Sequence, residues 1–306
     1  MPNLDISERG HLTTEQNNPR STELDQLSSV ELVTLFNEED QFTLQAIANA
    51  KESIAAAIDA SAQAIQQGGR LFYVGAGTSG RLGVLDAAEC PPTFCTPPEL
   101  VQGIIAGGAP ALLRSSEKLE DERSAGAAAI AERQIDGKDI VIGITAGGTT
   151  PYVLGALGAA QARQATTVAM SCVPAEQAPI AADIDIRIVT GPELLAGSTR
   201  LKAGTATKMA LNILSTGTMV RIGKVYGNRM VDVAVTNSKL YDRAVRILED
   251  LTQLPRVDAA TLLEKSECRV KLALLMHWSG LSANEGEALL TQANGDLRAA
   301  LNDATS

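Results

Sequence analysis

A glycine-rich segment with two hydroxyl side chains, residues 75–80, contains the residue types needed to bind an anion. It follows the apolar run 71–74 and leads into a helical pattern, so backbone N–H groups of the first helical turn would point toward a ligand. Thr78 and Ser79 add two hydroxyl donors at the same place. The segment predicts a site for a phosphate group carried by a small molecule.

Two nucleotide-binding motifs resemble this segment, but neither fits. Gly75, Gly77 and Gly80 satisfy G-x-G-x-x-G, yet a dinucleotide site also needs an acidic residue about 20 positions further on, at the end of the second strand. The next predicted strand ends in two glycines. A P-loop needs Lys and then Ser or Thr where this chain has Arg81 and Leu82. A phosphate monoester therefore fits better than a nucleotide.

Carboxylates are the expected proton-transfer groups, because the chain has only two histidines and both are far from this segment in sequence. Glu89 follows Arg81 at a distance of about 12 Å along a helix, so it would flank a sugar rather than touch its phosphate. We expect Pro91 and Pro92 to end the helix. The negative helix end and the apolar neighbours of Glu89 would then raise its pKa.

Composition limits the class of protein. With 306 residues, 45% of them hydrophobic, the chain can bury a sizeable core in about two domains. Its net charge of -10 predicts no nucleic-acid or anionic-membrane partner. The four cysteines form no C-x-x-C pair, which argues against a zinc site or a disulfide framework. No apolar signal segment or membrane-spanning run is present, so we expect a cytoplasmic protein.

Strands and helices alternate along the middle of the chain. Strands are predicted at 71–74, 101–106, 139–145, 166–171 and 184–189, with a helix at 119–134, which is typical of an α/β protein with a central parallel sheet. Before them we expect an arm that wraps another surface (residues 1–25), a helix from the capping box at Ser28 to 37–40, and a second helix at 41–67. Past Pro255 the pattern predicts three or four short helices.

Two further segments contain candidate ligand-binding groups. A second small-residue turn, 146–150, follows the third strand and precedes Pro151 at a helix start, so the strand-turn-helix device is used twice. Residues 198–205 combine hydroxyls with two cations, which would either complete an anion site or simply cap the next helix. Lys239 is similarly ambiguous between a ligand-binding and a solvated cation.

The segment 75–93 (Gly-Ala-Gly-Thr-Ser-Gly-Arg-Leu-Gly-Val-Leu-Asp-Ala-Ala-Glu-Cys-Pro-Pro-Thr) resembles the signature of N-acetylmuramic acid 6-phosphate etherases, which have the sugar isomerase (SIS) fold. The likeness continues through residues 14–19, 37–40, 150–153, 201–206, 212–217, 223–228 and 230–232, and is looser in the last part of the chain. It implies a three-layer α/β sandwich with a central parallel sheet in flavodoxin-like order and a small C-terminal helical appendage.

This resemblance also implies a division of the chain. It predicts an N-terminal arm with helices at 1–54, a SIS phosphosugar-binding domain at 55–222, a helical connection at 223–255 and a small helical unit at 256–306. Members of this fold commonly pair as homodimers with the site at the interface, and we carry that over as an expectation.

The activity implied is that of a lyase which releases D-lactate from N-acetylmuramic acid 6-phosphate, leaving N-acetylglucosamine 6-phosphate during cell-wall sugar recycling. The family is thought to use two glutamates, with neither cofactor nor metal. By position these are Glu89, the proton donor, and Glu120. On its own Glu120 belongs to a charge run, 117–123, typical of a solvated helix face. Which of the two removes a proton from C2 of the sugar is left open.

The resemblance also indicates substrate-binding residues in the two phosphate loops, namely Gly77, Thr78, Ser79, Thr145, Gly148 and Thr150. Ser198 and Lys239 are added from the sequence pattern alone, as the ambiguous candidates described above. The second loop departs from its relatives, which usually have Ala-Ser-Gly-Arg-Thr-Pro-Tyr, because Gly147 replaces the serine and Thr149 the arginine. Loss of the cation would weaken ligand binding by about 1.5–3 kcal/mol unless another group replaces it.

Two alternative functions share the predicted fold. A SIS aldose-ketose isomerase would use the same C2 chemistry without a leaving group, and would interconvert hexose phosphates. A non-catalytic sugar-phosphate sensor is suggested by the altered loop and by the family's kinship to glucokinase regulatory protein. Release of D-lactate distinguishes the etherase from both.

Overall fold

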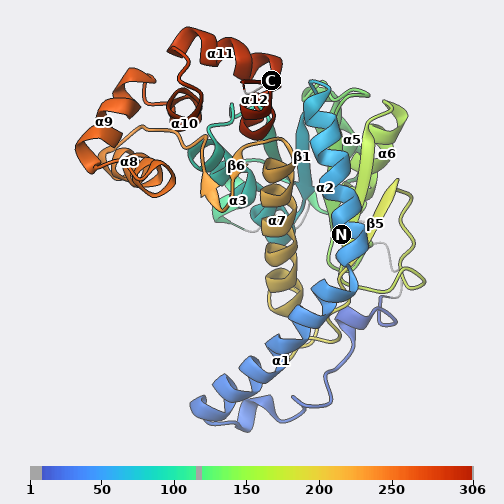
Figure 1. Ribbon diagram of the computed structural model, residues 1–306. Helices are drawn as coiled ribbons and strands as arrows, with labels where there is room; N and C mark the ends of the chain where they lie inside the picture. The colour runs from blue at the N-terminus through green and yellow to red at the C-terminus, as the bar shows by residue number, and fades with distance from the viewer. Residues whose placement is uncertain (1–8, 115–118, 305–306) are drawn as a thin grey trace. The chain divides into compact units, whose positions relative to one another are not determined.

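The computed structural model describes residues 9–114 and 119–304 (Figure 1). Contacts between residues divide the chain into two compact units, one of Met1–Ala88 and Glu99–Ser215 and the other of Glu89–Pro98 and Thr216–Ser306. The four-part division expected from the sequence is finer than this and stays a prediction. In the described ranges no helix is long and apolar enough to cross a membrane.

A five-stranded parallel sheet forms the centre of the first unit, in the order β2-β1-β3-β4-β5. Its strands are β1 (Leu71–Gly75), β2 (Val101–Ile105), β3 (Ile140–Ile144), β4 (Thr166–Ser171) and β5 (Ile184–Arg187). β1 and β3 are buried along their whole length, as expected of apolar strands covered on both faces. The predicted central parallel sheet and its flavodoxin-like order are confirmed.

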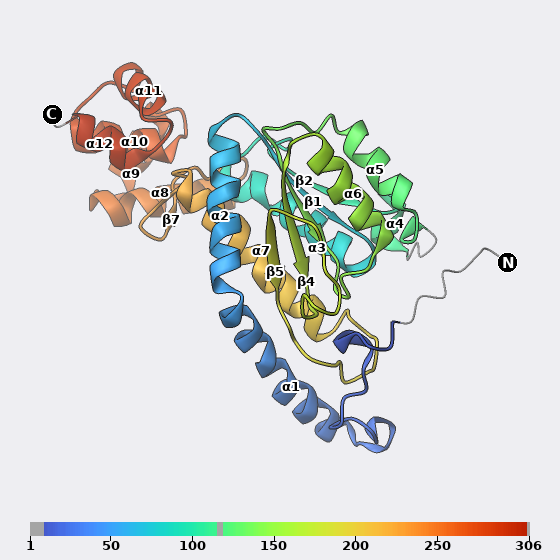
Figure 2. The same ribbon diagram turned by 90° about the vertical axis from the view of Figure 1, so that its right-hand side faces the viewer.

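Helices cover both faces of this sheet (Figure 2). On one face, α5 (Arg123–Glu132) and α6 (Pro151–Ala162) pack against Phe72 and Val74 of β1. On the other lie α2 (Lys51–Gln66), α3 (Gly77–Phe94) and α7 (Lys202–Arg221). Tyr73 points toward this second face, where its hydroxyl donates to Asp86 Oδ2 at 2.9 Å. The three-layer sandwich is therefore present.

Three helix ends differ from the predictions. The capping box at Ser28 is present, but α1 (Ser29–Asn49) continues through 37–40 and ends only before Ala50, because Glu39 is held inside the fold. α3 continues through Pro91 and Pro92 to Phe94, since two prolines remove only two ladder bonds and Cys95 N still donates to Pro91 O. α5 begins at Arg123 rather than near 119.

A buried ion pair joins the N-terminal arm, α1 and α7. Glu39 accepts hydrogen bonds from Lys202 Nζ at 2.5 Å, Asn18 Nδ2 at 2.8 Å and Arg20 Nη1 at 3.0 Å. The side chains of Glu39 and Lys202 are each only 4% exposed. Burial alone would raise the pKa of Glu39, but these hydrogen bonds outweigh it and hold the pKa below its ordinary value.

We predict that Glu39→Gln lowers the free energy of unfolding by about 3–5 kcal/mol, because it leaves the Lys202 ammonium buried without its counter-charge. A carboxyl with a lowered folded-state pKa stabilises the protein above its unfolded pKa, and this contribution is lost as the pH falls through the folded value. The difference between wild type and variant should therefore shrink in acid. Urea unfolding at neutral and acid pH measures it, with the exposed Glu38→Gln as control. Equal effects of the two variants would contradict the prediction.

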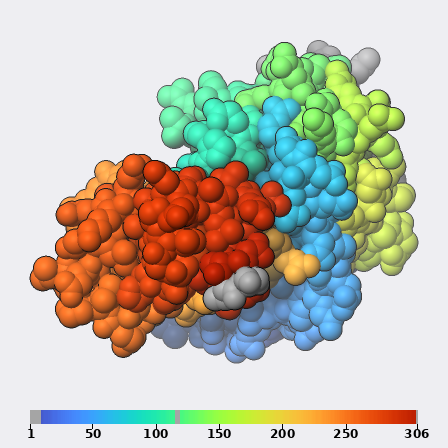
Figure 3. All heavy atoms as spheres, turned by 45° about the horizontal axis from the view of Figure 1, so that its top comes forward, coloured from blue at the N-terminus to red at the C-terminus, as the bar shows by residue number. Residues whose placement is uncertain are grey.

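The second unit is mostly helical. It contains a short hairpin, β6 (Val225–Tyr226) with β7 (Arg229–Met230), then α8 (Ser238–Thr252), α9 (Arg256–Lys265), α10 (Val270–Ser279), α11 (Ala283–Gln292) and α12 (Leu297–Ala304). Leu248, Leu263 and Leu274 are fully buried in its core, and Figure 3 shows α8 to α12 as one continuous body. The helical C-terminal appendage is confirmed, although the hairpin was not predicted.

Three shorter helices complete the first unit. The arm contains two 3₁₀ turns, η1 (Thr13–Glu15) and η2 (Leu24–Gln26), and one further turn, α4 (Pro110–Leu113), follows β2. The predictions made for residues 1–8 and 117–118 lie outside the described residues.

Candidate active site

Strand register brings the two predicted turns together. Gly75, the last residue of β1, pairs with Ile105 of β2 on one side and Ile144 of β3 on the other. The turns after β1 and β3 therefore lie side by side at the carboxyl edge of the sheet, where the strand order reverses. This is the place where open α/β sheets bind their ligands.

The first turn is held tightly by two glycines. A Cβ on Gly75 would lie 2.6 Å from Gly80 N, and one on Gly80 would lie 2.7 Å from Gly75 O, so side chains at these positions would separate the helix from the strand. α3 consequently starts only two residues after β1, with Gly77 at φ +51°. The backbone N–H groups of Gly77, Thr78 and Ser79, at the positive end of an 18-residue helix, are the expected anion donors.

The second turn is fixed by its own hydroxyls. Thr145 Oγ1 donates to Thr150 Oγ1 at 2.9 Å and accepts from Thr150 N at 3.4 Å. Gly148 has φ +74°, and a Cβ there would lie 2.7 Å from Ala178 Cβ. Thr145 is buried, so it and Gly148 shape the turn, whereas Thr150 lines the neighbouring pocket.

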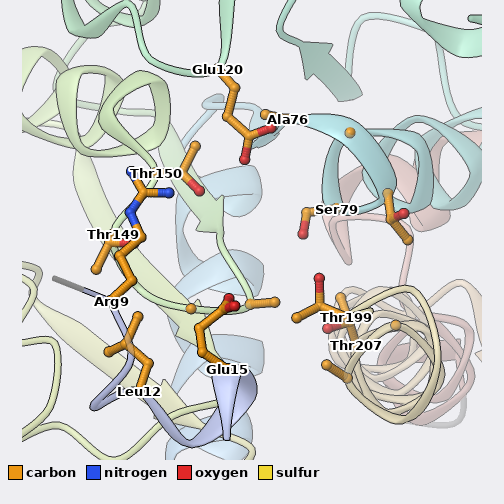
Figure 4. Close-up of a pocket in the computed structure, with 16 residues that line it drawn as sticks. Arg9, Leu12, Glu15, Ala76, Ser79, Glu120, Thr149, Thr150, Thr199 and Thr207 are labelled. Carbon is orange, nitrogen blue, oxygen red and sulfur yellow. The ribbon is translucent and has the colours of Figure 1, made fainter. Parts of the chain in front are cut away.

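A cavity of about 180 Å³ lies over these two turns (Figure 4). Five segments of the first unit line it, and their residues are Arg9, Leu12 and Glu15; Ala76, Gly77, Thr78 and Ser79; Glu120; Ala146, Gly147, Thr149 and Thr150; and Thr199, Ala203, Gly204 and Thr207. Of the predicted site residues, the structure thus brings Gly77, Thr78, Ser79, Thr150 and Glu120 to one pocket.

Residues 198–205 do not supply the two cations that were expected to complete an anion site. Thr199, rather than Ser198, lines the pocket. Lys202 is paired with Glu39 inside the fold, and Arg200 is exposed and does not line the pocket. Lys239 is exposed at the start of α8, in the second unit.

Glu89 does not have the surroundings that the sequence suggested. Because α3 continues to Phe94, Glu89 is not at the negative end of the helix. Its side chain is exposed and so lacks the expected apolar environment. It belongs to the second unit and is not among the residues that line the pocket.

Glu120 is better placed for a role in the pocket than the charge run around it, residues 117–123, suggested. Its backbone carbonyl accepts a hydrogen bond from Tyr152 N at 3.0 Å, which ties it to the first turn of α6. The preceding Leu119 packs against the core of the unit, so this segment is not a fully solvated helix face. Glu120 itself is half-buried, and its carboxylate points into the cavity (Figure 4).

The N-terminal arm supplies three lining residues that the sequence argument missed. Leu12 is 1% exposed and packs with Val173 and Ala178. Thr13 donates from both its N and its Oγ1 to Gln177 Oε1, each at 2.9 Å. The arm does wrap another surface, as expected, and in doing so it brings Arg9 and Glu15 to the pocket. The only sequence signal for this part of the site was the family motif at residues 14–19, to which no function had been assigned.

A buried thiol beneath the pocket is unsuited to nucleophilic catalysis. Cys172 follows β4, and its Sγ lies 3.8 Å from Oγ1 of Thr207, which lines the pocket. Burial raises the pKa of Cys172 to about 12, so its thiolate is scarce at neutral pH. The carboxylates of Glu15 and Glu120 are the acid–base groups of the described lining.

A buried acid of α3, Asp86, accepts hydrogen bonds from the hydroxyls of Tyr73 at 2.9 Å and Ser215 at 3.2 Å. Burial raises its pKa, and these two hydrogen bonds only partly offset the rise. A carboxyl with a raised folded-state pKa stabilises the protein at low pH, and this contribution is lost as the pH rises through the folded value. Asp86→Asn removes the charge, so we predict that the variant gains on the order of 1 kcal/mol over wild type at pH 8 and loses that gain in acid.

Thermal unfolding of both proteins between pH 4 and pH 8 tests this prediction. A difference in stability that does not change with pH would mean that Asp86 does not titrate differently in the folded and unfolded states.

The chain is similar to proteins of one kind over almost its full length. An N-acetylmuramic acid 6-phosphate etherase from Crocosphaera subtropica is 71% identical over 296 residues, covering 97% of each chain. One from Synechocystis sp. is 68% identical over 304 residues, covering 99% of this chain and 100% of the relative.

Domain models and solved structures add to this comparison. The model of the glucokinase regulatory protein N-terminal SIS domain matches residues 53–161, and that of the C-terminal lid domain of glucokinase regulatory protein matches residues 227–271. A phosphoheptose isomerase from Francisella tularensis is similar in structure, with 17% identity and a TM-score of 0.48, covering 63% of this chain and 98% of that one.

Proposed function

We propose that this chain, which belongs to the N-acetylmuramic acid 6-phosphate etherase family, is a lyase that cleaves the D-lactyl ether of N-acetylmuramic acid 6-phosphate. The products are D-lactate and N-acetylglucosamine 6-phosphate, as in the recycling of cell-wall sugar. The observation that carries the proposal is the pocket at the carboxyl edge of the sheet, where the two turns predicted to bind the ligand meet the Glu120 carboxylate.

Acid–base chemistry is sufficient for this reaction. An unactivated ether resists direct displacement, but in the open-chain sugar C2 lies next to the aldehyde and carries a removable proton. Loss of that proton allows elimination, in which the C3–O bond breaks and the ether oxygen leaves with the lactate. Water then adds to C3 of the unsaturated aldehyde, and C2 regains a proton. Each well-placed proton transfer contributes about 10²- to 10⁴-fold to the rate.

The pocket residues divide between binding and proton transfer. The N-terminus of α3, with Thr78 and Ser79, holds the phosphate. The sugar ring extends from there past Thr150 toward Glu120. Glu120 exchanges protons at C2, and Glu89 protonates the departing lactate oxygen. The support for Glu120 is its direction into the pocket, whereas Glu89 is assigned from the family resemblance. Ser198 and Lys239 stay predictions, since neither lines this pocket.

We further propose that the protein works in the cytoplasm as a homodimer with the substrate site at the interface. α1 supports an interface, because Val30, Val33 and Leu44 of this helix are 76%, 70% and 61% exposed, and apolar side chains gathered on one helix favour association. None of the four described cysteines forms a disulfide, which suits a reducing compartment. Light scattering after size-exclusion chromatography measures the oligomeric state.

A D-lactate assay tests the proposed activity. Purified protein is mixed with N-acetylmuramic acid 6-phosphate, with and without a chelator, and both D-lactate and N-acetylglucosamine 6-phosphate are quantified. We expect stoichiometric release of both that persists with chelator. Binding of the phosphosugar without turnover would instead indicate a sensor, and interconversion of hexose phosphates without lactate would indicate an isomerase.

A further inference from the structure

The charges around the pocket do not match those of the proposed substrate. N-acetylmuramic acid 6-phosphate carries two anionic groups, a phosphate and the lactyl carboxylate. Among the described residues that line the pocket, Arg9 is the one cation, and it is accompanied by two acids, Glu15 and Glu120. Hydroxyls and backbone N–H groups at a helix N-terminus can hold a phosphate without a cation. The guanidinium is therefore free to serve the other anion.

The arm holds Arg9 in place at the pocket. Leu12 N donates to Arg9 O at 3.0 Å, which closes a turn between the two residues. Leu12 is buried against Val173 and Ala178, and the next residue, Thr13, is bonded twice to Gln177. Arg9 thus extends from a fixed point of the arm, and its side chain alone has to adjust to a ligand.

The guanidinium lies at the Glu120 end of the pocket. Arg9 Nη2 is 3.9 Å from Oδ1 of Asp121, the residue after Glu120. In Figure 4 the Arg9 side chain lies beside Thr149 and Thr150, across the cavity from Ser79 at the start of α3. The Arg9 and Asp121 side chains are 47% and 62% exposed, and an exposed pair at this separation contributes little. Arg9 can therefore exchange Asp121 for a ligand carboxylate at small cost.

We propose that Arg9 binds the lactyl carboxylate of the substrate and so distinguishes the substrate from its own product. The inference rests on the proposed function, in which Glu120 acts at C2, next to the ether carbon. The lactyl group is attached at C3, next to C2, so an arginine beside Glu120 is within reach of the lactyl carboxylate. Guanidinium and carboxylate match in a planar, two-bond geometry. Once lactate has left, the sugar phosphate has lost this contact, which favours its release.

Binding of two ligands to two variants tests the proposal. N-acetylmuramic acid 6-phosphate and N-acetylglucosamine 6-phosphate both carry the phosphate, but only the first carries a lactyl carboxylate. Their dissociation constants are measured by calorimetry with Arg9→Ala in the Glu120→Gln background, where we expect slow turnover. Arg200→Ala in the same background is the matched control, because Arg200 is exposed close to the pocket segment yet does not line the pocket.

We expect Arg9→Ala to weaken binding of N-acetylmuramic acid 6-phosphate by about 10- to 100-fold, the value of a charge-assisted hydrogen bond. Binding of N-acetylglucosamine 6-phosphate should change less than about twofold, and Arg200→Ala should change neither. Arg9→Lys should recover part of the loss, because it keeps the charge but not the fork of donors. An unchanged melting temperature in each variant shows that the protein is still folded.

Parallel weakening of both ligands would place Arg9 on the phosphate and overturn the proposal. So would unchanged binding of both. If the wild-type protein bound the sugar but released no D-lactate, the proposed activity would fail, while the ratio of the two dissociation constants would still report on Arg9 by itself.

Discussion

Replacing Glu120 with Gln is expected to lower kcat for D-lactate release by about 10²- to 10⁴-fold. The amide keeps the shape of the side chain that points into the pocket but can neither accept nor return a proton. The turns proposed to bind the substrate are untouched, so KM should change much less than kcat. Steady-state assays of D-lactate measure both values, and exchange of the C2 proton with deuterated solvent should slow in parallel.

The control for this variant is Glu122→Gln, an exposed neighbour in the same charge run that does not line the pocket. It should have near-wild-type kinetics. If Glu120→Gln retained more than about a third of the activity, Glu120 would have a structural rather than a catalytic role. Glu15 would then become the leading acid–base candidate in the pocket.

Glu89→Gln should lower kcat by a similar factor, about 10²- to 10⁴-fold, if Glu89 protonates the departing lactate oxygen. In the proposed mechanism the two glutamates act on different atoms, so the two variants should differ in their exchange of the C2 proton. Glu89→Gln should still exchange the C2 proton with solvent, because the base at C2 remains, whereas Glu120→Gln should not. A matched control is Glu99→Gln, which changes another exposed glutamate outside the pocket.

Near-wild-type lactate release by Glu89→Gln would reject its assignment as the acid. That outcome would agree with the exposed position of Glu89 in a single chain and would leave the pocket carboxylates, Glu15 and Glu120, as the pair that carries both proton transfers.

The parts of the fold that the sequence predicted best are those specified by local pattern. The β-branched run at Ile140–Ile144 needs cover on both faces, and each of the five strands was found close to its predicted position. Helix ends were less predictable, because they depend on distant partners. The acidic segment 37–40 looked like a break, yet Glu39 pairs with Lys202, 163 positions away, and the helix continues through it.

The two turns of the site were also predictable, since glycine and hydroxyl residues directly after a strand indicate a ligand-binding turn from the local sequence alone. The arm was not. Thr13 is bonded to Gln177 at a separation of 164 positions, and no periodicity in the sequence indicates such a contact. The pairing of Lys202 with Glu39 was equally unpredictable, and without it the Lys202 charge seemed available to a ligand. Proline at 91 and 92 was misleading because one further turn of α3 tolerates the missing N–H groups.

Isotope labelling tests the central claim most directly. With N-acetylmuramic acid 6-phosphate as substrate, the reaction is run in deuterated water enriched in oxygen-18 and the products are analysed by mass spectrometry and NMR. Elimination followed by water addition predicts one deuterium at C2 and oxygen-18 at C3 of the sugar phosphate, with unlabelled ether oxygen in the lactate. Oxygen-18 in the lactate, or a sugar that keeps its original hydrogen at C2, would contradict the account.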